Sequence, residues 1–260
     1  MRAIALAFGL ILMGSAQAQD AADRVAPEGT GAGTLQVPAM LAASAEAKAE
    51  GRPVKSDDWM ISAANPLAVE SGAKVLARGG TAADAMVTVQ AVLGLVEPQS
   101  SGLGGGGFLV WHDGASGKIT TLDGRETAPL AATPQLFQDA AGKPLEFFDA
   151  VIGGRSVGVP GTPALLAEAH ARWGRSDWRG LFTDAIGLAE DGFVVSPRLA
   201  TLVARDADRL ERFAATRAHF LPDGAPFSSI TLTSLSSMLS ASSPGFPMVA
   251  EHAMNCGSLP

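Results

Sequence analysis

Arg125 ends the part of this chain that is richest in glycine, and its guanidinium is a group that could bind an anion. It follows Asp123-Gly124 in a turn-like segment that comes directly after a run of strand-forming residues. A planar guanidinium can donate two parallel hydrogen bonds to one carboxylate, which makes arginine specific for that group. On the residues alone, the plainer arrangement is the default: Arg125 pairs with the adjacent Glu126 or points into solvent.

A glycine-rich loop lies shortly before this arginine. Its members are Gly102, Gly104, Gly105, Gly106 and Gly107. Such a run gives up much conformational entropy on folding, so it indicates that another backbone or a ligand passes very close to it. Its letters also fit G-x-G-x-x-G, but dinucleotide binding requires a strand before the glycines and a helix after them. Here the order is reversed, so we interpret the loop as a site of close backbone packing.

Other side chains that could do chemistry lack the partners that they would need. Ser100 and Ser101 precede the glycines, but no histidine pattern beside them indicates an activated nucleophile. The histidines are His112, His170, His219 and His252. They show no H-x-x-x-H or H-E-x-x-H spacing, and Cys256 is the only cysteine, so we expect no metal site and no intrachain disulfide.

Composition excludes several classes of function. The chain has 260 residues, a net charge of −7 and no basic cluster, which disfavours nucleic acid and anionic membranes as partners. Beyond the N-terminus, no run of about 18 apolar residues predicts a membrane span. At 47% hydrophobic residues, the chain can bury a sizeable core.

The pattern of elements predicts an α/β chain of the α+β type, with mixed or antiparallel strands. Asn65 with Pro66 predicts one helix start, and Thr81 with Asp84 forms a capping box at another, where the carboxylate serves the helix end. The predicted helices cover 66–78, 82–96, 163–173, 178–191 and 197–213, with short ones near 38–50 and 134–139. The predicted strands are 60–64, 151–160 and a hairpin of 108–112 with 118–122.

The chain divides into four parts by composition. Residues 1–18 have the pattern of a signal peptide: Arg2, then an apolar core, then Ala16-Gln17-Ala18 as the cleavage site. This pattern predicts export to the periplasm or outside the cell. Residues 19–57 predict a mobile N-terminus of the mature protein, and 58–227 the folded segment. The last part is a tail, 228–260. Its first sixteen residues include eight serines and no charge. We therefore interpret the tail as non-native sequence, such as the product of a frameshift.

Four segments in the same order carry a family resemblance: EPQSSGLGGGGF, TLDGRETAP, GGRSVGVPGTPALLAEAH and LAEDGFVVSPRLA. The chain resembles the γ-glutamyltranspeptidase (glutathione hydrolase) family over roughly Trp59 to Phe227, which corresponds to the N-terminal part of the family's large subunit. The resemblance implies an exported precursor with the N-terminal-nucleophile hydrolase fold, an αββα sandwich that is incomplete in this truncated chain. It implies hydrolysis of glutathione or γ-glutamyl amides, or transfer of the γ-glutamyl group to amino acids and peptides. It implies no metal and no organic cofactor.

The resemblance also implies how the reaction is shared between subunits. The precursor cuts itself, and the new N-terminal threonine of the small subunit attacks the γ-glutamyl amide with its own amine as general base. That nucleophile segment begins Thr-Thr-His, whereas the one Thr-Thr of this chain, Thr120-Thr121, is followed by Leu122. We therefore expect no catalytic residue here and no activity from this chain alone. Arg125 matches the family arginine that holds the α-carboxylate of the γ-glutamyl group, and Gly124 stands where relatives often carry a bulkier residue.

Two other functions stay open on the sequence. The chain could be a periplasmic domain that captures amino-acid carboxylates with Arg125 and performs no catalysis. It could also be an exported scaffold that pairs with a separately encoded small subunit.

Overall fold

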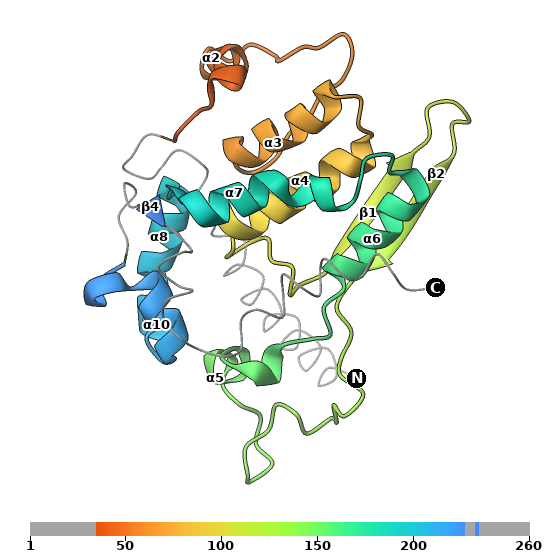
Figure 1. The fold of residues 1–260 in the computed structure, drawn as a ribbon. Helices are drawn as coiled ribbons and strands as arrows, with labels where there is room; N and C mark the ends of the chain where they lie inside the picture. The colour runs from red at the N-terminus through yellow and green to blue at the C-terminus, as the bar shows by residue number, and fades with distance from the viewer. Residues whose placement is uncertain (1–34, 227–231, 234–260) are drawn as a thin grey trace, which may run out of the picture. The chain divides into compact units, whose positions relative to one another are not determined.

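Two helices joined by a tight turn form the centre of the structure, a computed structural model that describes residues 35–226 and 232–233 (Figure 1). They are α3 (Pro66–Ala77) and α4 (Ala82–Val96). The expected signal peptide and almost all of the expected non-native tail lie outside the described residues.

Local chemistry sets the ends of these two helices as the sequence predicts. The Asn65 side chain accepts a hydrogen bond from the Leu67 N–H at 3.0 Å, with Pro66 at the first helical position. Gly79 follows α3 with φ +86°, a conformation that favours glycine. The capping box is complete: the Thr81 N–H donates to Asp84 Oδ2 at 2.8 Å, and the Asp84 N–H donates to Thr81 Oγ1 at 3.1 Å.

Helix α4 is buried on several sides rather than along one stripe. Ala83, Val87 and Ala91 are all buried, whereas Ala82 is exposed. The reason is that α4 contacts α3, α6 (Thr162–Trp173) and α7 (Thr183–Asp191). A helix surrounded by other helices needs small apolar residues on most of its faces, which α4 has.

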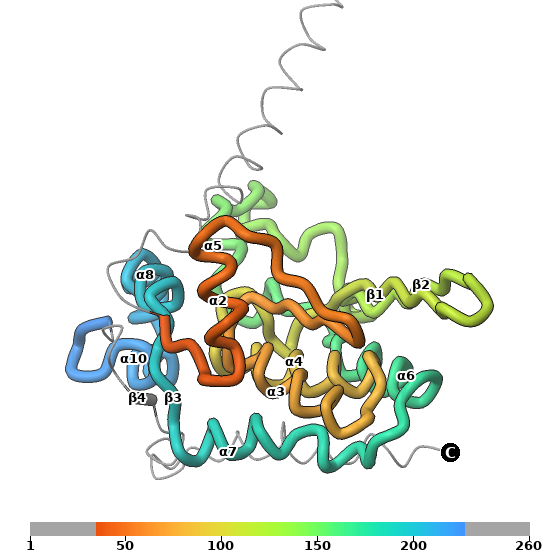
Figure 2. Tube along the Cα trace, turned by 90° about the horizontal axis from the view of Figure 1, so that it is seen from above, coloured from red at the N-terminus to blue at the C-terminus, as the bar shows by residue number. Residues whose placement is uncertain are grey.

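The predicted hairpin is present and packs one of its faces on α6. Strands β1 (Gly107–His112) and β2 (Ile119–Gly124) are antiparallel, with Leu109 opposite Leu122. Leu109 forms a buried cluster with Leu165 and Ala169 of α6, and Trp111 stacks on Trp173 at 4.6 Å between ring centroids. Figure 2 shows the hairpin extending away from the helix pair, with its turn at the far end.

The remaining elements are mostly short helices. They are η1 (Ala39–Leu41), α2 (Ala42–Ala49), α5 (Phe147–Val151), η2 (Gly154–Ser156), η3 (Arg179–Phe182), β3 (Phe193–Val194), α8 (Pro197–Arg205), α9 (Ala207–Leu210), α10 (Ala214–Phe220), η4 (Pro222–Gly224) and β4 (Leu232–Thr233). Strand β3 pairs antiparallel with β4. No helix in the described ranges combines the length and the apolar character needed to cross a membrane.

Two of the expected strands are wrong. Residues 60–64 are irregular, because the Ile61 side chain packs against Gly72 of α3 and no neighbouring strand pairs with this segment in the described residues. Residues 151–160 contain the end of α5 and then η2, and only Val159 forms a bridge, with Thr127. Residues rich in valine and glycine form a strand only where a partner edge is available.

Two expected helices also differ from the structure. Residues 134–137 form turns, and Gln138 forms a bridge with Pro144. The Asp139 side chain accepts hydrogen bonds from the N–H groups of Ala141 and Lys143 and stabilises a turn in place of a helix end. The single helix expected over 197–213 is divided into α8 and α9. The break is at Asp206, whose φ of −100° and ψ of 10° leave the helical range.

Candidate functional site

Close backbone packing in the glycine-rich loop is concentrated at Gly106. A Cβ at this position would lie 2.6 Å from both the Glu126 nitrogen and the Gly124 oxygen, so no larger residue fits without movement of the backbone. The neighbouring Gly105 oxygen accepts hydrogen bonds from the N–H groups of Gly161 and Thr162, at 2.9 and 3.0 Å. By contrast, a Cβ on Gly104 would meet nothing within 4 Å. The loop is thus fixed between the end of β2 and the start of α6.

Arg125 lies just beyond β2 and pairs with the adjacent glutamate. Its Nε is 2.7 Å from Glu126 Oε2, and its side chain is 66% exposed. Its backbone N–H donates to Asp123 Oδ1 at 3.0 Å, which forms a local turn. This is the plainer of the two arrangements that the sequence left open. It occupies Nε, and no other ion pair involves the guanidinium within the part of the chain that the structure describes.

The Glu126 carboxylate is held in its ionised form. A hydrogen bond from its own backbone N–H, the nearby Arg125 guanidinium and the Gly106 N–H together hold the pKa of Glu126 below its usual value. Glu126 therefore connects the arginine to the tightest point of the glycine-rich loop.

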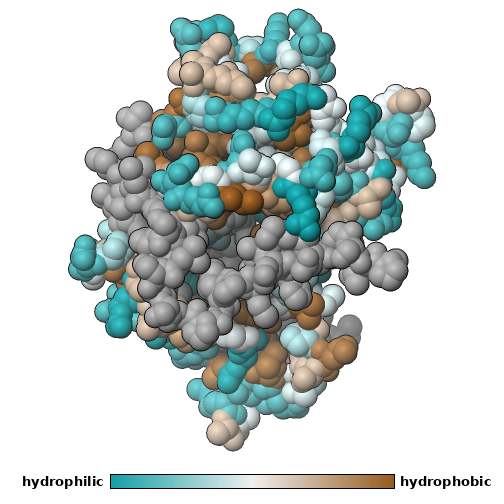
Figure 3. Space-filling model, viewed as in Figure 1, coloured by the Kyte–Doolittle hydropathy of each residue, from teal (hydrophilic) through white to brown (hydrophobic). Residues whose placement is uncertain are grey.

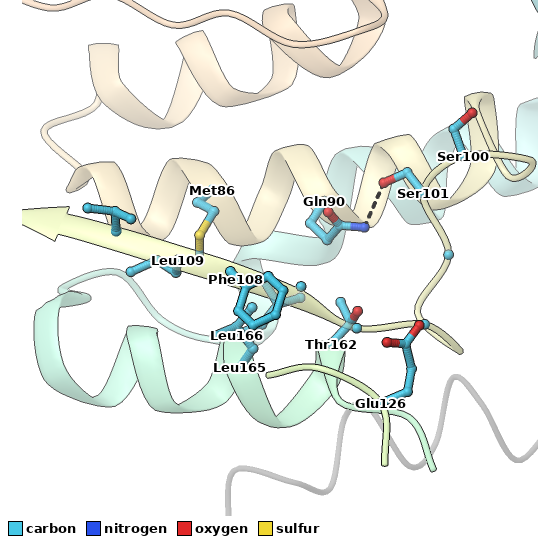
Figure 4. Close-up of a pocket in the computed structure, with 15 residues that line it drawn as sticks. Met86, Gln90, Ser100, Ser101, Phe108, Leu109, Glu126, Thr162, Leu165 and Leu166 are labelled. Atoms are coloured by element: carbon cyan, nitrogen blue, oxygen red, sulfur yellow. Dashed lines mark hydrogen bonds between the residues drawn. The ribbon is translucent and has the colours of Figure 1, made fainter. Parts of the chain in front are cut away.

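A cavity of about 580 Å³ lies beside β1, within the range of small-molecule sites (Figure 4). Its walls come from α4, from residues 100–107, from β1 and from the first turns of α6, and Glu126 lies near Thr162 in the close-up. The Gln90 side chain donates a hydrogen bond to Ser101 Oγ at 2.9 Å on this wall. Arg125 is not among the lining residues, so the structure does not bring the predicted carboxylate anchor and the cavity together.

Neither serine beside the glycines is arranged as a nucleophile. Ser101 Oγ accepts from Gln90, and Ser100 Oγ accepts from Arg198 Nη2 at 3.2 Å. An amide and a guanidinium are donors in these contacts, and neither can take a proton from a hydroxyl. No group of three His, Cys, Asp or Glu residues that could hold a metal ion occurs in the described part of the chain.

Asp84 has a second role that the sequence did not reveal. This carboxylate is fully buried and accepts hydrogen bonds from the N–H groups of Arg175 and Ser176, at 3.1 and 3.2 Å, and from Ser176 Oγ at 3.0 Å. Burial raises its pKa, but the backbone N–H groups of Thr81, Arg175 and Ser176 outweigh it, so that the pKa of Asp84 is below its usual value. These partners lie 91 and 92 residues away, where no local pattern could predict them.

This cluster contains a serine, a histidine and an aspartate, but its geometry is not that of a catalytic triad. The Ser176 hydroxyl donates to Asp84, and His170 Nε2 lies 2.9 Å from the Ser176 carbonyl oxygen rather than from its hydroxyl. The cluster therefore fixes the loop after α6 to the start of α4.

A second buried carboxylate, Glu97, connects three segments at the other end of α4. Its Oε1 accepts from Asn65 Nδ2 and from Ser196 Oγ, both at 3.1 Å. Its Oε2 accepts from Arg198 Nη1 at 2.9 Å and from Gln99 Nε2 at 2.6 Å. Because Asn65 and Ser196 are the N-caps of α3 and α8, one carboxylate positions two helix starts.

Comparison with known proteins decides the family. Residues 68–239 match the family model described as Gamma-glutamyltranspeptidase. The chain belongs to the γ-glutamyltranspeptidase family. The resemblance that the four sequence segments indicated is therefore confirmed. The match continues past Phe227 into the serine-rich stretch, and the boundary near Ser228 stays a prediction.

Relatives of this γ-glutamyltranspeptidase family chain include longer precursors. A glutathione hydrolase proenzyme of Bacillus subtilis is 45% identical over 169 residues, which cover 65% of this chain and 29% of the relative. The Acylase ACY 1 proenzyme of a Pseudomonas species (strain SE83) is 34% identical over 197 residues, which cover 74% of this chain and 35% of the relative. The chain thus spans about a third of the length of these curated relatives.

A solved structure confirms the fold class. The γ-glutamyltranspeptidase of Helicobacter pylori aligns with a TM-score of 0.68 and 32% identity, over 72% of this chain and 54% of that one. With the helices and antiparallel strands described above, this likeness places the chain in the α+β class of the N-terminal-nucleophile hydrolases, as predicted.

Proposed function

We propose that this chain is the N-terminal part of the large subunit of an exported γ-glutamyltranspeptidase. The complete enzyme would hydrolyse glutathione or another γ-glutamyl amide, or transfer the γ-glutamyl group to an amino acid or peptide. The observation that carries the proposal is the family match over residues 68–239, supported by the 45% identity to a glutathione hydrolase proenzyme. No metal or organic cofactor takes part in this proposal.

Arg125 is the residue that we assign to substrate binding. Its side chain is 66% exposed just beyond β2, and its Nε pairs with Glu126. In this proposal the two terminal nitrogens bind a second carboxylate. Two parallel bonds from those nitrogens suit the α-carboxylate of a γ-glutamyl group. Glu126 would then hold the guanidinium in place from behind.

The nucleophile of this proposal belongs to the small subunit of the precursor. Thr120-Thr121 lies within β2, opposite Trp111 and Val110, and continues into Leu122, so it is not the threonine segment of the family. The chain by itself would bind the substrate at most and would not cleave it. A purified 260-residue chain that hydrolyses a γ-glutamyl anilide would contradict this.

The decisive test uses this chain assembled with the remaining part of the B. subtilis relative, and compares two substrates. One is a γ-glutamyl anilide, and the other is the 4-aminobutanoyl anilide, which lacks only the α-carboxylate. We expect Arg125→Ala to lower kcat/KM for the first by at least about thirtyfold, the equivalent of about 2 kcal/mol, and to leave the second unchanged. Arg172→Ala, at another partly exposed ion pair, is the matched control. Equal losses on both substrates would refute the assignment.

The two other functions would give different results. Stoichiometric binding of free glutamate by the isolated chain, measured by calorimetry and abolished by Arg125→Ala, would favour a binding domain. Activity that returns on mixing with a separately encoded small subunit of the same organism would favour a two-chain enzyme.

Export and the nature of the C-terminal tail are separate parts of the proposal. Sequencing of the mature N-terminus should give Gln19 if residues 1–18 are removed. The encoding DNA should be read in all three frames from about the Phe227 codon. A frame that continues into Thr-Thr-His would identify the serine-rich tail as an artefact.

A further inference from the structure

The backbone of residues 124–127, which we call the Arg125 turn, is tightly enclosed, although the Arg125 side chain is 66% exposed. The closest approach is at Gly161, which directly precedes α6. A Cβ on this residue would lie 2.0 Å from the Gly124 oxygen and 3.0 Å from the Arg125 oxygen. Gly161 has φ −104° and ψ −27°, and a negative φ is open to residues with a side chain. Glycine is therefore required here by the lack of space and not by the backbone angles.

A second glycine of the same segment makes a similar contact with the end of the turn. A Cβ on Gly158 would lie 2.9 Å from Glu126 Cβ and 3.1 Å from the Thr127 oxygen. Between the two glycines, the Val159 N–H donates a hydrogen bond to that same oxygen at 2.9 Å. Residues 158–161, which we call the glycine segment, thus lie directly along the Arg125 turn.

The glycine-rich loop contacts the same turn and is itself bonded to the glycine segment. Gly106 lies against the turn, as described above. The Gly105 oxygen accepts hydrogen bonds from the N–H groups of Gly161 and Thr162, at 2.9 and 3.0 Å. The Arg125 turn therefore contacts two backbone segments that are hydrogen-bonded to each other, so backbone atoms fix its position.

The Arg125 guanidinium depends on this backbone for its place. Within the described part of the chain, its ion pair is with Glu126, which belongs to the same turn. Because both members of the pair move with the turn, the pair by itself does not fix the guanidinium relative to the rest of the protein. The contacts of the turn with the glycine segment and with the glycine-rich loop decide where the guanidinium lies.

We propose that Gly158 and Gly161 are positioning residues for substrate binding, because they hold the backbone of Arg125 where its guanidinium meets the α-carboxylate of a γ-glutamyl group. A long side chain reaches its ligand accurately only from a fixed Cα, and a misplacement of about 1 Å can cost about a hundredfold in rate. The two glycines act through Arg125. This inference rests on the proposed function for the identity of the substrate, and the position of the arginine is tested separately from activity.

The first test detects a movement of Arg125 in the isolated chain. The Nε–H signal of Arg125 in NMR spectra reports its pairing with Glu126. We expect Gly158→Ala to shift this signal and to speed exchange of the Val159 amide at least about tenfold, because the methyl group separates the glycine segment from the turn. Gly154→Ala is the matched control, since a Cβ at this nearby position would meet nothing within 4 Å. It should change neither quantity.

The second test uses the assembled protein and the two anilides introduced above. Gly158→Ala should lower kcat/KM for the γ-glutamyl anilide at least about tenfold, mainly through KM, and should leave the 4-aminobutanoyl anilide within about twofold. A loss of folded protein would lower kcat for both substrates equally, so the difference between the substrates separates positioning from stability. Gly161→Ala has the closer contact and should show the larger effect, with circular dichroism as the check on its fold.

Three results would overturn the inference. They are an unchanged Arg125 signal in Gly158→Ala, equal losses of kcat/KM on the two anilides, and an effect of Gly154→Ala as large as that of Gly158→Ala. A shifted Arg125 signal together with a parent assembly that hydrolyses neither anilide would support the positioning of the arginine and count against the proposed function instead.

Discussion

The helices around α4 and the β1–β2 hairpin differ in how completely their polar groups are hydrogen-bonded and their apolar side chains are buried. Around α4, the buried carboxylates Asp84 and Glu97 each accept several hydrogen bonds, and apolar residues such as Val87 are fully covered. On the hairpin, Leu109 is buried, but Phe108 and Val110 are more than 60% exposed. The helices therefore bury their apolar side chains against one another, whereas the hairpin buries the side chains on only one of its two sides.

The segment between the hairpin and α6 resembles the hairpin in this respect. Phe147 and Phe148 of α5 are 68% and 55% exposed, and the Arg209 guanidinium lies 5.1 Å from the Phe148 ring centroid. Figure 3 shows hydrophobic surface in the lower part of the view, where α5 lies in Figure 1. Exposed aromatic residues of this size are typical of surfaces that contact other molecules.

The largest predicted effect concerns the buried Asp84. Asp84→Ala removes the buried acceptor for the part-buried N–H groups of Arg175 and Ser176 and leaves these donors without their partner. We expect the free energy of unfolding to fall by about 3–5 kcal/mol, measured by urea denaturation. The control Glu168→Ala, at an exposed pair with Arg172, should cost about 0–1 kcal/mol. Equal losses would show that the helical core does not depend on this carboxylate.

Within the glycine-rich loop, Gly106 is closely packed and Gly104 is not. Gly106→Ala places a methyl group 2.6 Å from the Glu126 nitrogen and should lower the free energy of unfolding by about 1–3 kcal/mol. Gly104→Ala places it in open space and should cost little. Thermal unfolding of both variants provides the measurement, and a larger loss for Gly104→Ala would refute the packing that we describe.

Acid should weaken the helical side through the same carboxylate. The pKa of Asp84 is lowered from 3.8 in the folded chain, so its stabilising contribution is complete above that value and is lost as the pH falls through the folded-state pKa. Urea midpoints measured from pH 2 to pH 6 should therefore fall at the acid end. Asp84→Asn should have a shallower pH dependence than the parent, and an unchanged slope would assign the acid sensitivity to other groups.

The smallest effect is expected at Val110, on the exposed side of the β1–β2 hairpin. Val110→Lys in the isolated chain should change the free energy of unfolding by no more than about 0.5 kcal/mol, because the side chain is 71% exposed. Val87→Lys, at a fully buried position of α4, should prevent stable folding. If Val110→Lys destabilised the isolated chain strongly, the hairpin would already be covered, contrary to the comparison above.

Residue types alone were enough to predict the features that depend on neighbours in the chain. The capping box of Thr81 and Asp84, the start of α3 at Asn65-Pro66, the hairpin and the family segments were all predicted correctly. Caps and turns are hydrogen bonds between residues two to four positions apart, so the local sequence contains both partners.

The tertiary structure decided the features whose partners are distant. The strands expected at 60–64 and 151–160 did not form, because a strand depends on an edge elsewhere in the fold and not on its own composition. The contacts of Asp84 with Ser176 and of Glu97 with Arg198 join residues 92 and 101 positions apart. The exposure of Val110 depends on which surfaces the rest of the chain covers, and that is a property of packing in three dimensions.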